Sequence, residues 1–169
     1  MKEQIETALR PLIGMPLWAI GRASVLEWFI FGVPREVIDH KQQAKMVGEY
    51  ALHIQCAWRV INSKCVVVGS QDRYVPSGDP NQEIDDFDWD VEGANRCDEQ
   101  VAQLLNNKKS LVVIGIETGS IGSFRLILDD DYVLEVFPNT SLEDEYWRLF
   151  QPYTESEHFV VTGIGIEAD

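Results

Sequence analysis

The sequence predicts an α+β fold, a mainly antiparallel sheet of about seven to eight strands with helices packed on it. Three consecutive strand-like segments are separated by too few residues for crossover helices, so they must pair antiparallel. They cover residues 110–117, 122–128 and 132–137. Helical spacing of apolar residues marks residues 2–13, 97–106 and 141–150. A chain of 169 residues suits a single domain, over residues 1–169, better than two.

The N-terminal segment has the apolar pattern of an amphipathic helix, with spacing i, i+3, i+4, i+7 and i+8. The residues in this pattern are Ile5, Ala8, Leu9, Leu12 and Ile13. Pro11 fits poorly inside a helix, so the helix should end or bend near residue 10. Gly14 and Pro16 then close the segment.

Two strands, or one bent strand, should follow this helix. Residues 17–24 and 25–31 are rich in Trp, Ile, Val and Phe, which favour strands. Residues 25–31 are apolar on nearly both faces and should lie centrally in the sheet. Residues 34–47 are predicted to form a loop with at most one helical turn. The chain should end in a further strand at 159–166.

The clearest period of two runs from Tyr50 to Val60 and predicts one continuous strand with alternate residues buried. Asn62 and Ser63 are turn residues, and a strand from Cys65 to Gly69 would complete a hairpin. With a two-residue turn, the numbers of paired residues sum to 125. This register places His53 opposite Asp72, Gln55 opposite Ser70 and Trp58 opposite Val67.

The two later helices are predicted from their caps as well as from their spacing. Asn95 can cap the helix at 97–106. The apolar face of that helix holds Cys97, Val101, Leu104 and Leu105. Thr140 and Glu143 fit a capping box at the start of the short helix at 141–150.

Composition indicates a globular protein of the cytoplasm. Hydrophobic residues make up 45% and charged residues 25% of the chain, which allows a sizeable core. No apolar run is long enough to cross a bilayer, and no signal peptide is recognisable. Cys56, Cys65 and Cys97 are too scattered for a disulfide framework or a zinc site, and free thiols suit a reducing compartment.

The net charge of −14 is unevenly distributed. Residues 1–78 hold nine basic and seven acidic side chains, a net of +2, whereas residues 79–169 hold five basic and twenty-one acidic ones, a net of −16. This acidity argues against nucleic acid as the main partner, because phosphate binding needs positive charge. Solvated surface charge and electrostatic steering of a basic partner both explain the acidic half.

One acidic segment matches the ligand spacing of a calcium-binding loop. Positions 1, 3, 5, 6 and 12 of that loop correspond to Asp88, Asp90, Glu92, Gly93 and Glu99. Position 5 is longer than the usual Asp or Asn, and no second loop exists to pair with this one. A solvated acidic loop without metal is therefore expected. A calcium site formed by Asp88, Asp90, Glu92 and Glu99 is the alternative.

A second alternative is an enzyme or small-ligand protein with a site around His53, Arg59 and Asp72. The hairpin register brings these residues together, and a histidine beside a carboxylate can act as a general base. A cross-strand polar pair on a solvated sheet face explains the same residues. Cys56 points to the face opposite His53, so it cannot serve as a nucleophile there.

Sequence motifs of the common enzyme classes are missing from the chain. It has no nucleophile elbow, phosphate-binding loop, dinucleotide-binding glycine motif or HExxH zinc motif. The three histidines, His40, His53 and His158, lack metal-ligand spacing. No cofactor is therefore expected, and a binding protein is favoured over an enzyme.

Three segments resemble small bacterial proteins of unknown function. They are YVLEVFPNTSLEDEYWRLF at 132–150, HFVVTGIGIE at 158–167 and GEYALHIQCAWRV at 48–60. Some small acidic proteins of this kind resemble immunity proteins, which neutralise toxins by binding them. The resemblance implies a binding role, and it transfers no catalytic or ligand residues.

The leading hypothesis is a non-enzymatic protein-binding module, such as an immunity-type inhibitor of a basic toxin or nuclease. The acidic half supplies the charge for steering such a partner. Trp89 and Trp147 lie in acidic segments, should be partly exposed, and would act as anchors. The expected contact residues are Asp86, Asp88, Trp89, Asp90, Glu143, Glu145 and Trp147.

Overall fold

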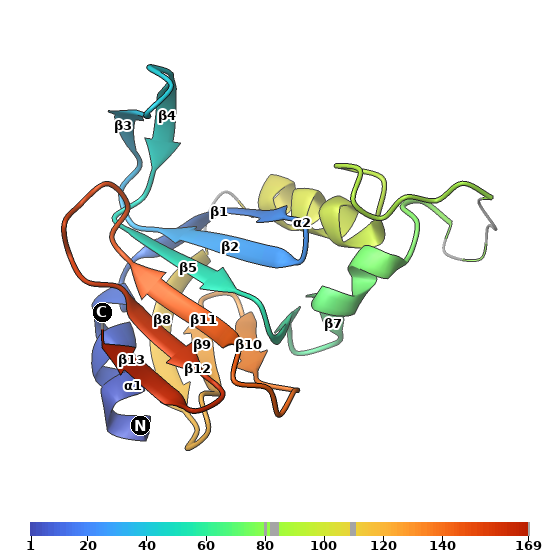
Figure 1. Ribbon diagram of the computed structural model, residues 1–169. Coiled ribbons are helices and arrows are strands. Elements are labelled where there is room, and N and C mark those ends of the chain that lie inside the picture. The colour runs from blue at the N-terminus through green and yellow to red at the C-terminus, as the bar shows by residue number, and fades with distance from the viewer. Residues whose placement is uncertain (80, 82–84, 109–110, 169) are drawn as a thin grey trace.

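The chain folds into a large antiparallel sheet flanked by two α-helices (Figure 1). The computed structural model describes residues 1–79, 81, 85–108 and 111–168. Within these residues there are thirteen strands, eleven of which form one sheet, and two α-helices. The predicted α+β fold with seven to eight strands and three helices is therefore wrong, whereas the mainly antiparallel pairing is confirmed.

The helices and strands have the following bounds. The helices are α1 (Lys2–Leu9), its 3-10 continuation η1 (Arg10–Leu12), the 3-10 helix η2 (Ser70–Tyr74) and α2 (Arg96–Asn107). The strands of the first half are β1 (Pro16–Ala23), β2 (Leu26–Phe31), β3 (Arg35–Ile38), β4 (Ala44–Val47), β5 (Tyr50–Ile54), β6 (Ala57–Ile61) and β7 (Val66–Gly69). The strands of the second half are β8 (Leu111–Thr118), β9 (Phe124–Leu128), β10 (Val133–Phe137), β11 (Glu145–Phe150), β12 (Phe159–Thr162) and β13 (Gly165–Ala168).

The sheet order is β13-β12-β11-β5-β2-β1-β8-β9-β10-β6-β7, so β5 and β6, adjacent in sequence, lie far apart in it. The two halves of the sheet face each other across the core. Phe29 of β2 meets Trp58 of β6 edge-on at 5.2 Å between ring centroids, and Phe124 of β9 meets Trp147 of β11 at 4.8 Å. The hairpin β3–β4 stands apart from this sheet and projects from the molecule (Figure 1).

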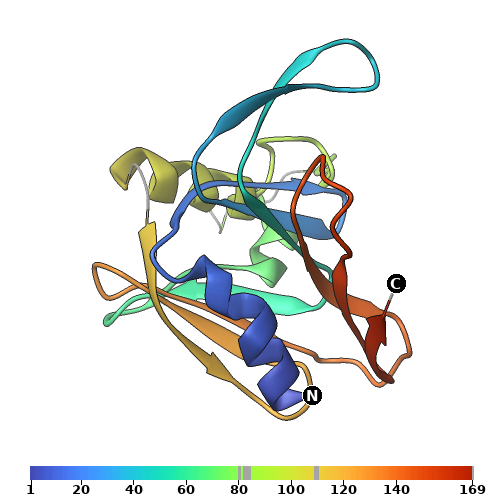
Figure 2. The same cartoon turned by 90° about the vertical axis from the view of Figure 1, so that its left-hand side faces the viewer.

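Each α-helix buries its apolar face against the sheet. α1 packs on β8 through Ile5 and Leu9 (Figure 2), and Pro11 falls in η1, as the sequence predicts for a bend near residue 10. α2 buries Cys97, Val101 and Leu104 and contacts β1, β7 and η2. It therefore bridges the end strand β7 and the inner strand β1. No helix among the described residues has the length and apolarity to cross a membrane.

The predicted strand from Tyr50 to Val60 is two strands joined by a bend. The backbone N–H groups of Gln55 and Cys56 both donate to the carbonyl of Tyr146, at 2.9 and 3.2 Å, where β5 ends and the chain leaves for the other half of the sheet. The side-chain alternation continues through the bend, so Ile54, Cys56 and Trp58 are all buried. The period of two therefore predicts burial correctly but does not reveal the break.

The predicted register of the β6–β7 hairpin is also wrong. Arg59 pairs with Gly69 and Val60 with Val68, so the paired numbers sum to 128. The side chain of Asn62 accepts hydrogen bonds from the N–H groups of Lys64 and Cys65, at 2.8 and 3.0 Å, which lengthens the turn beyond two residues.

Three further segments differ from the prediction. Residues 34–47 form the hairpin β3–β4, whose turn is closed by Asp39 Oδ1 accepting from the N–H groups of Lys41 and Gln43. Residues 141–150, predicted as a helix, contain β11, because pairing with β5 and β12 outweighs the local helical pattern. Residues 159–166 split into β12 and the start of β13.

The three cysteines are free thiols. Cys56 and Cys97 are buried, as their apolar patterns predict, and burial raises the pKa of the Cys56 thiol to about 12. Cys65 is exposed in the turn between β6 and β7. The two buried thiols are therefore small core residues that stay protonated.

Candidate functional site

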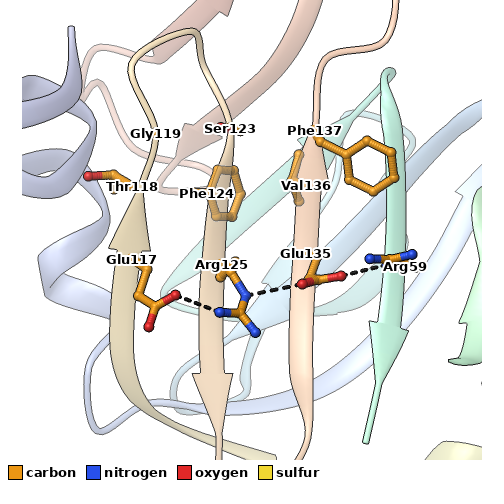
Figure 3. Close-up of a pocket in the computed structure, with 10 residues that line it drawn as sticks. All are labelled: Arg59, Glu117, Thr118, Gly119, Ser123, Phe124, Arg125, Glu135, Val136 and Phe137. Carbon is orange, nitrogen blue, oxygen red and sulfur yellow. Dashed lines mark hydrogen bonds and ion pairs between the residues drawn. The ribbon is translucent and has the colours of Figure 1, made fainter. Parts of the chain in front are cut away.

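One hollow on the sheet surface contains four alternating charges. Glu117 of β8, Arg125 of β9, Glu135 of β10 and Arg59 of β6 follow one another in the strand register (Figure 3). Arg125 lies 2.7 Å from Glu117 and 3.1 Å from Glu135, and Arg59 Nε donates to Glu135 at 2.5 Å. Each charge has an opposite charge beside it, as expected of cross-strand pairs that stabilise a sheet. We therefore interpret these four charges as cross-strand pairs that stabilise the sheet, and not as a binding site.

A second cluster of charges joins segments that are far apart in sequence. Arg22 projects from β1, and its side chain is only 7% exposed. Its guanidinium donates to both carboxylate oxygens of Asp98 in α2, at 2.8 and 3.0 Å, and to Asp90 Oδ1 at 3.0 Å. It also donates to the carbonyl groups of Trp89, Asp90 and Val91, at 3.2, 3.3 and 3.3 Å. One buried arginine thus holds the backbone of residues 89–91 against the sheet.

The N-terminus of α2 holds the same segment from its other side. Asn95 caps α2 by accepting from the Asp98 N–H at 2.9 Å, as the sequence predicts, and its Nδ2 donates to the Trp89 carbonyl at 2.9 Å. Asp98 also accepts from the Gly93 N–H at 2.8 Å. Burial raises the pKa of Asp98, but the hydrogen bonds from Arg22 and Gly93 outweigh burial, so the net pKa is lowered and the carboxylate is ionised.

Residues 85–92, called the acidic loop below, present carboxylates and apolar groups together. Its five acidic side chains are exposed; they are Asp85, Asp86, Asp88, Asp90 and Glu92. Val91 is 53% exposed. Trp89 is half-buried, and its indole packs edge-on against the exposed Tyr74 at 5.4 Å between ring centroids. The loop therefore combines negative charge with an aromatic pair and an exposed valine.

Four of the predicted contact residues lie in this loop. Asp86 and Asp88 are exposed, and Asp88 Oδ1 accepts from the Asp90 N–H at 3.0 Å, which shapes the turn. Asp90 is exposed although one of its oxygens accepts from Arg22, and Trp89 is half-buried. The structure therefore groups these four residues on one segment, of which Trp89 and Asp90 are held by Arg22.

The other three predicted contact residues lie at the start of β11 and just before it. Glu143 is exposed. Glu145 is half-buried and ion-paired with Arg148, whose Nε donates to it at 2.8 Å. Trp147 is completely buried, and its Nε1–H donates to the Gly122 carbonyl at 2.7 Å. The expectation that Trp147 is partly exposed is wrong, because its strand position faces the core.

The alternative calcium ligands do not surround a common point. Asp90 accepts from Arg22, and Glu99 accepts from the Gly78 N–H at 3.2 Å. Asp88 and Glu92 are exposed. Among residues 1–79, 81, 85–108 and 111–168, no group of three His, Cys, Asp or Glu side chains could hold a metal ion.

The alternative site around His53, Arg59 and Asp72 is likewise spread over the surface. His53 pairs with Trp28 and Arg148 in the sheet and lines a hollow of about 320 Å³. Burial, followed by the charge of Arg148, lowers its pKa. Arg59 and Asp72 border a different hollow, of about 410 Å³. These three side chains therefore share no site in this structure.

Of the residues that hold the acidic loop, Asn95 is recognisable in the sequence as a helix cap, whereas Arg22 carries no local signal. Arg22 and Glu27 stand in apolar strands, pair with each other in the β1–β2 register, and face inward. A charged residue at an inward strand position signals a buried partner. The partner of Arg22 lies 76 residues away in α2, a separation that no local pattern bridges.

Comparison of the chain with models of protein families, with curated protein sequences and with solved structures found no match.

Proposed function

We propose that this chain is a non-enzymatic module that binds a basic protein partner through the acidic loop. The carrying observation is the anchoring of that loop by Arg22, which donates to three consecutive backbone carbonyls and to the side chain of Asp90. A segment with five carboxylates in eight residues repels itself and would otherwise move freely. The buried arginine offsets part of that repulsion and holds residues 89–91 against the sheet.

Such ordering favours binding, because the loop loses its conformational entropy during folding and loses little more during association. The exposed carboxylates steer a positively charged partner toward the loop. Trp89, Tyr74 and Val91 offer apolar contacts, and aromatic side chains commonly anchor protein interfaces. An immunity-type inhibitor of a basic toxin or nuclease would use a surface with these properties.

The test compares the proteins captured from a bacterial lysate by three forms of the chain, all immobilised at equal density. They are the wild type, a loop variant (Asp86→Asn, Asp88→Asn, Glu92→Gln) and a control variant (Glu36→Gln, Glu155→Gln, Glu157→Gln). Both variants remove three exposed carboxylates, so they share the same net charge. The captured proteins are identified by mass spectrometry, and affinities are then measured with the purified partner.

The proposal expects a basic protein that the wild type and the control variant retain and the loop variant loses. Raising the salt concentration should release it, because screening weakens exposed charge pairs. Equal retention by the loop and control variants would refute the proposal, since net charge alone would then explain binding.

A further inference from the structure

The hollow of about 320 Å³ lies on the outer face of the sheet, over β1, β2 and β5 and away from the core. Ile30 of β2 pairs with Ala19 of β1 and with Ala51 of β5, and all three line the hollow. Ala51 in turn pairs with Phe150 of β11. Directly paired residues lie on the same face of a sheet, whereas Phe29, next to Ile30, is buried on the other face. The small side chains in this row leave open space above the strands.

Two further segments form the walls of this hollow. β4 contributes residues 45–47, and the loop after β11 contributes residues 152 and 153. Arg35, in the strand β3 that pairs with β4, donates to the carbonyl of Pro152, so the hairpin and the loop lie side by side (Figure 1). Walls that are joined before a ligand arrives lose little conformational entropy when it binds.

The lining of the hollow contains several aromatic rings. Trp28 and His53 pair in the β2–β5 register, and the ring of His53 meets Phe150 edge-on, at 4.8 Å between centroids. Gly21 of β1 pairs with Trp28, and a Cβ atom at Gly21 would come within 2.2 Å of the indole, so the indole leans over β1. The aromatic residues that line the hollow are Trp18, Trp28, His53, Phe150 and Tyr153. Because aromatic rings attract one another edge-on or offset-stacked, this lining suits a flat aromatic ligand.

The hollow also differs in charge from the chain as a whole. The sequence holds 28 acidic and 14 basic residues, yet no described Asp or Glu lines this hollow. Lys45 lines it and forms no ion pair with a described residue. Burial, followed by the charge of Arg148, lowers the pKa of His53, so its imidazole is neutral at pH 7. The lining therefore has a net positive charge, which favours an anionic ligand.

We propose that this hollow binds a small aromatic carboxylate. Its ring packs against Trp28 and Phe150, and its carboxylate accepts from the ammonium of Lys45. Because β5 separates β2 from β11, the two aromatic rings line opposite sides of the hollow. An aromatic amine would meet the charge of Lys45 without a carboxylate to pair with. No described residue of the acidic loop lines the hollow, so the inference is independent of the proposed function.

The test uses three probes of similar size: 2-naphthoate, its uncharged amide 2-naphthamide, and the saturated decahydro-2-naphthoate. Each is titrated into ¹⁵N-labelled protein at neutral pH. 2-Naphthoate should shift the indole N–H signals of Trp18 and Trp28 in a saturable way. It should bind about three- to fivefold more tightly than 2-naphthamide, because only the carboxylate pairs with Lys45. It should also bind more tightly than decahydro-2-naphthoate, which has no aromatic ring.

The variant Lys45→Gln removes the charge at the hollow and should bind 2-naphthoate and 2-naphthamide with equal affinity. The matched control Lys41→Gln removes an exposed charge from the turn of the same hairpin, outside the hollow, and should keep the wild-type preference. Equal affinity of the wild type for these two probes, or a preference that survives in Lys45→Gln, would overturn the inference. Absence of a saturable shift at both indoles with 2-naphthoate would overturn it as well.

Discussion

At the scale of single residues, the molecule is marked by charges at inward positions. Arg22, Arg73 and Asp98 each form hydrogen bonds in these positions, whereas Glu27 Oε2 receives none from the described residues and has only the ion pair with Arg73 at 3.7 Å. A buried carboxyl without a hydrogen-bond donor is poorly solvated when it is ionised, and burial raises the pKa of Glu27 to about 8 although Arg73 opposes this rise. Glu27 is therefore the residue at which the stability of the fold should depend most clearly on pH.

Replacing Glu27 by Gln should change how stability depends on pH. The pKa of this carboxyl is about 8 in the folded chain, against 4.5 for an ordinary glutamate. Between these values the folded chain holds a proton that the unfolded chain releases, so the wild type loses stability as pH rises from about 4.5 to about 8. The slope is at most about 1.4 kcal/mol per pH unit. Urea denaturation of both proteins at pH 5, 7 and 9 measures it.

Gln has no proton to lose, so the variant should gain on the wild type by a few kcal/mol between pH 5 and pH 9. The exposed substitution Glu157→Gln serves as the control, and its stability should follow the wild type at every pH. Parallel pH profiles for Glu27→Gln and the wild type would mean that Glu27 is ionised in the folded chain.

Replacing Arg22 by Lys should loosen the acidic loop, although the charge is kept. A lysine cannot donate at once to Asp98, Asp90 and the three carbonyls that the guanidinium reaches. We expect a loss of about 2–4 kcal/mol in the free energy of unfolding, because an ammonium cannot replace both the two-point contact with Asp98 and the hydrogen bonds to residues 89–91. Amide exchange at Gly93, whose N–H donates to Asp98, should also become faster.

The matched control for Arg22→Lys is Arg10→Lys, in the exposed ion pair with Glu6. Its loss should stay within about 1 kcal/mol, since exposed ion pairs contribute little. Equal losses for the two variants, with unchanged exchange at Gly93, would show that Arg22 does not order the loop.

At the scale of elements, local patterns predict burial and caps better than they predict partners. The helix at 97–106, its Asn95 cap and the three strands from 110 to 137 are confirmed, because each depends on residues close together in sequence. The bend at Gln55 and Cys56 depends on the carbonyl of Tyr146, ninety residues further along the chain. The alternation of residues within the strand cannot predict that contact.

In the segment 141–150, a local pattern predicts the wrong element, because distant partners decide its structure. Its capping box and apolar spacing favour a helix, yet Trp147 and Leu149 are buried in β11 between β5 and β12. Ladder pairing on both sides and the burial of a whole indole outweigh a helical preference of a few tenths of a kcal/mol per residue. Tertiary packing therefore decides the element.

The acidic loop should bind calcium no better than magnesium. Asp90 is engaged by Arg22, and Glu99 accepts from Gly78, so these two candidate ligands are already hydrogen-bonded elsewhere. Both salts at equal ionic strength should therefore shift the melting temperature equally, through screening alone. A rise of several degrees with calcium only, lost in Glu99→Gln, would instead identify a calcium site, because a ligand of the native state stabilises it by mass action.

At the scale of the whole molecule, the two halves of the sequence contribute different parts of the proposed binding surface. The acidic half contributes the loop, and the first half contributes the strands β1 and β2 that anchor it through Arg22. The uneven charge could be read from the sequence, and so could the exposure of Asp86, Asp88 and Asp90. The buried position of Glu27 and the anchoring by Arg22 could not, because β1 and α2 meet only in the folded chain.

The most direct test of the loop as a binding surface is the association rate constant with the captured partner, measured across a range of ionic strength. The wild type and the control variant (Glu36→Gln, Glu155→Gln, Glu157→Gln) should associate rapidly at low salt and slow as salt rises. The loop variant (Asp86→Asn, Asp88→Asn, Glu92→Gln) should associate several-fold more slowly at low salt and converge with them at high salt. Identical salt profiles for the loop and control variants would contradict the assignment.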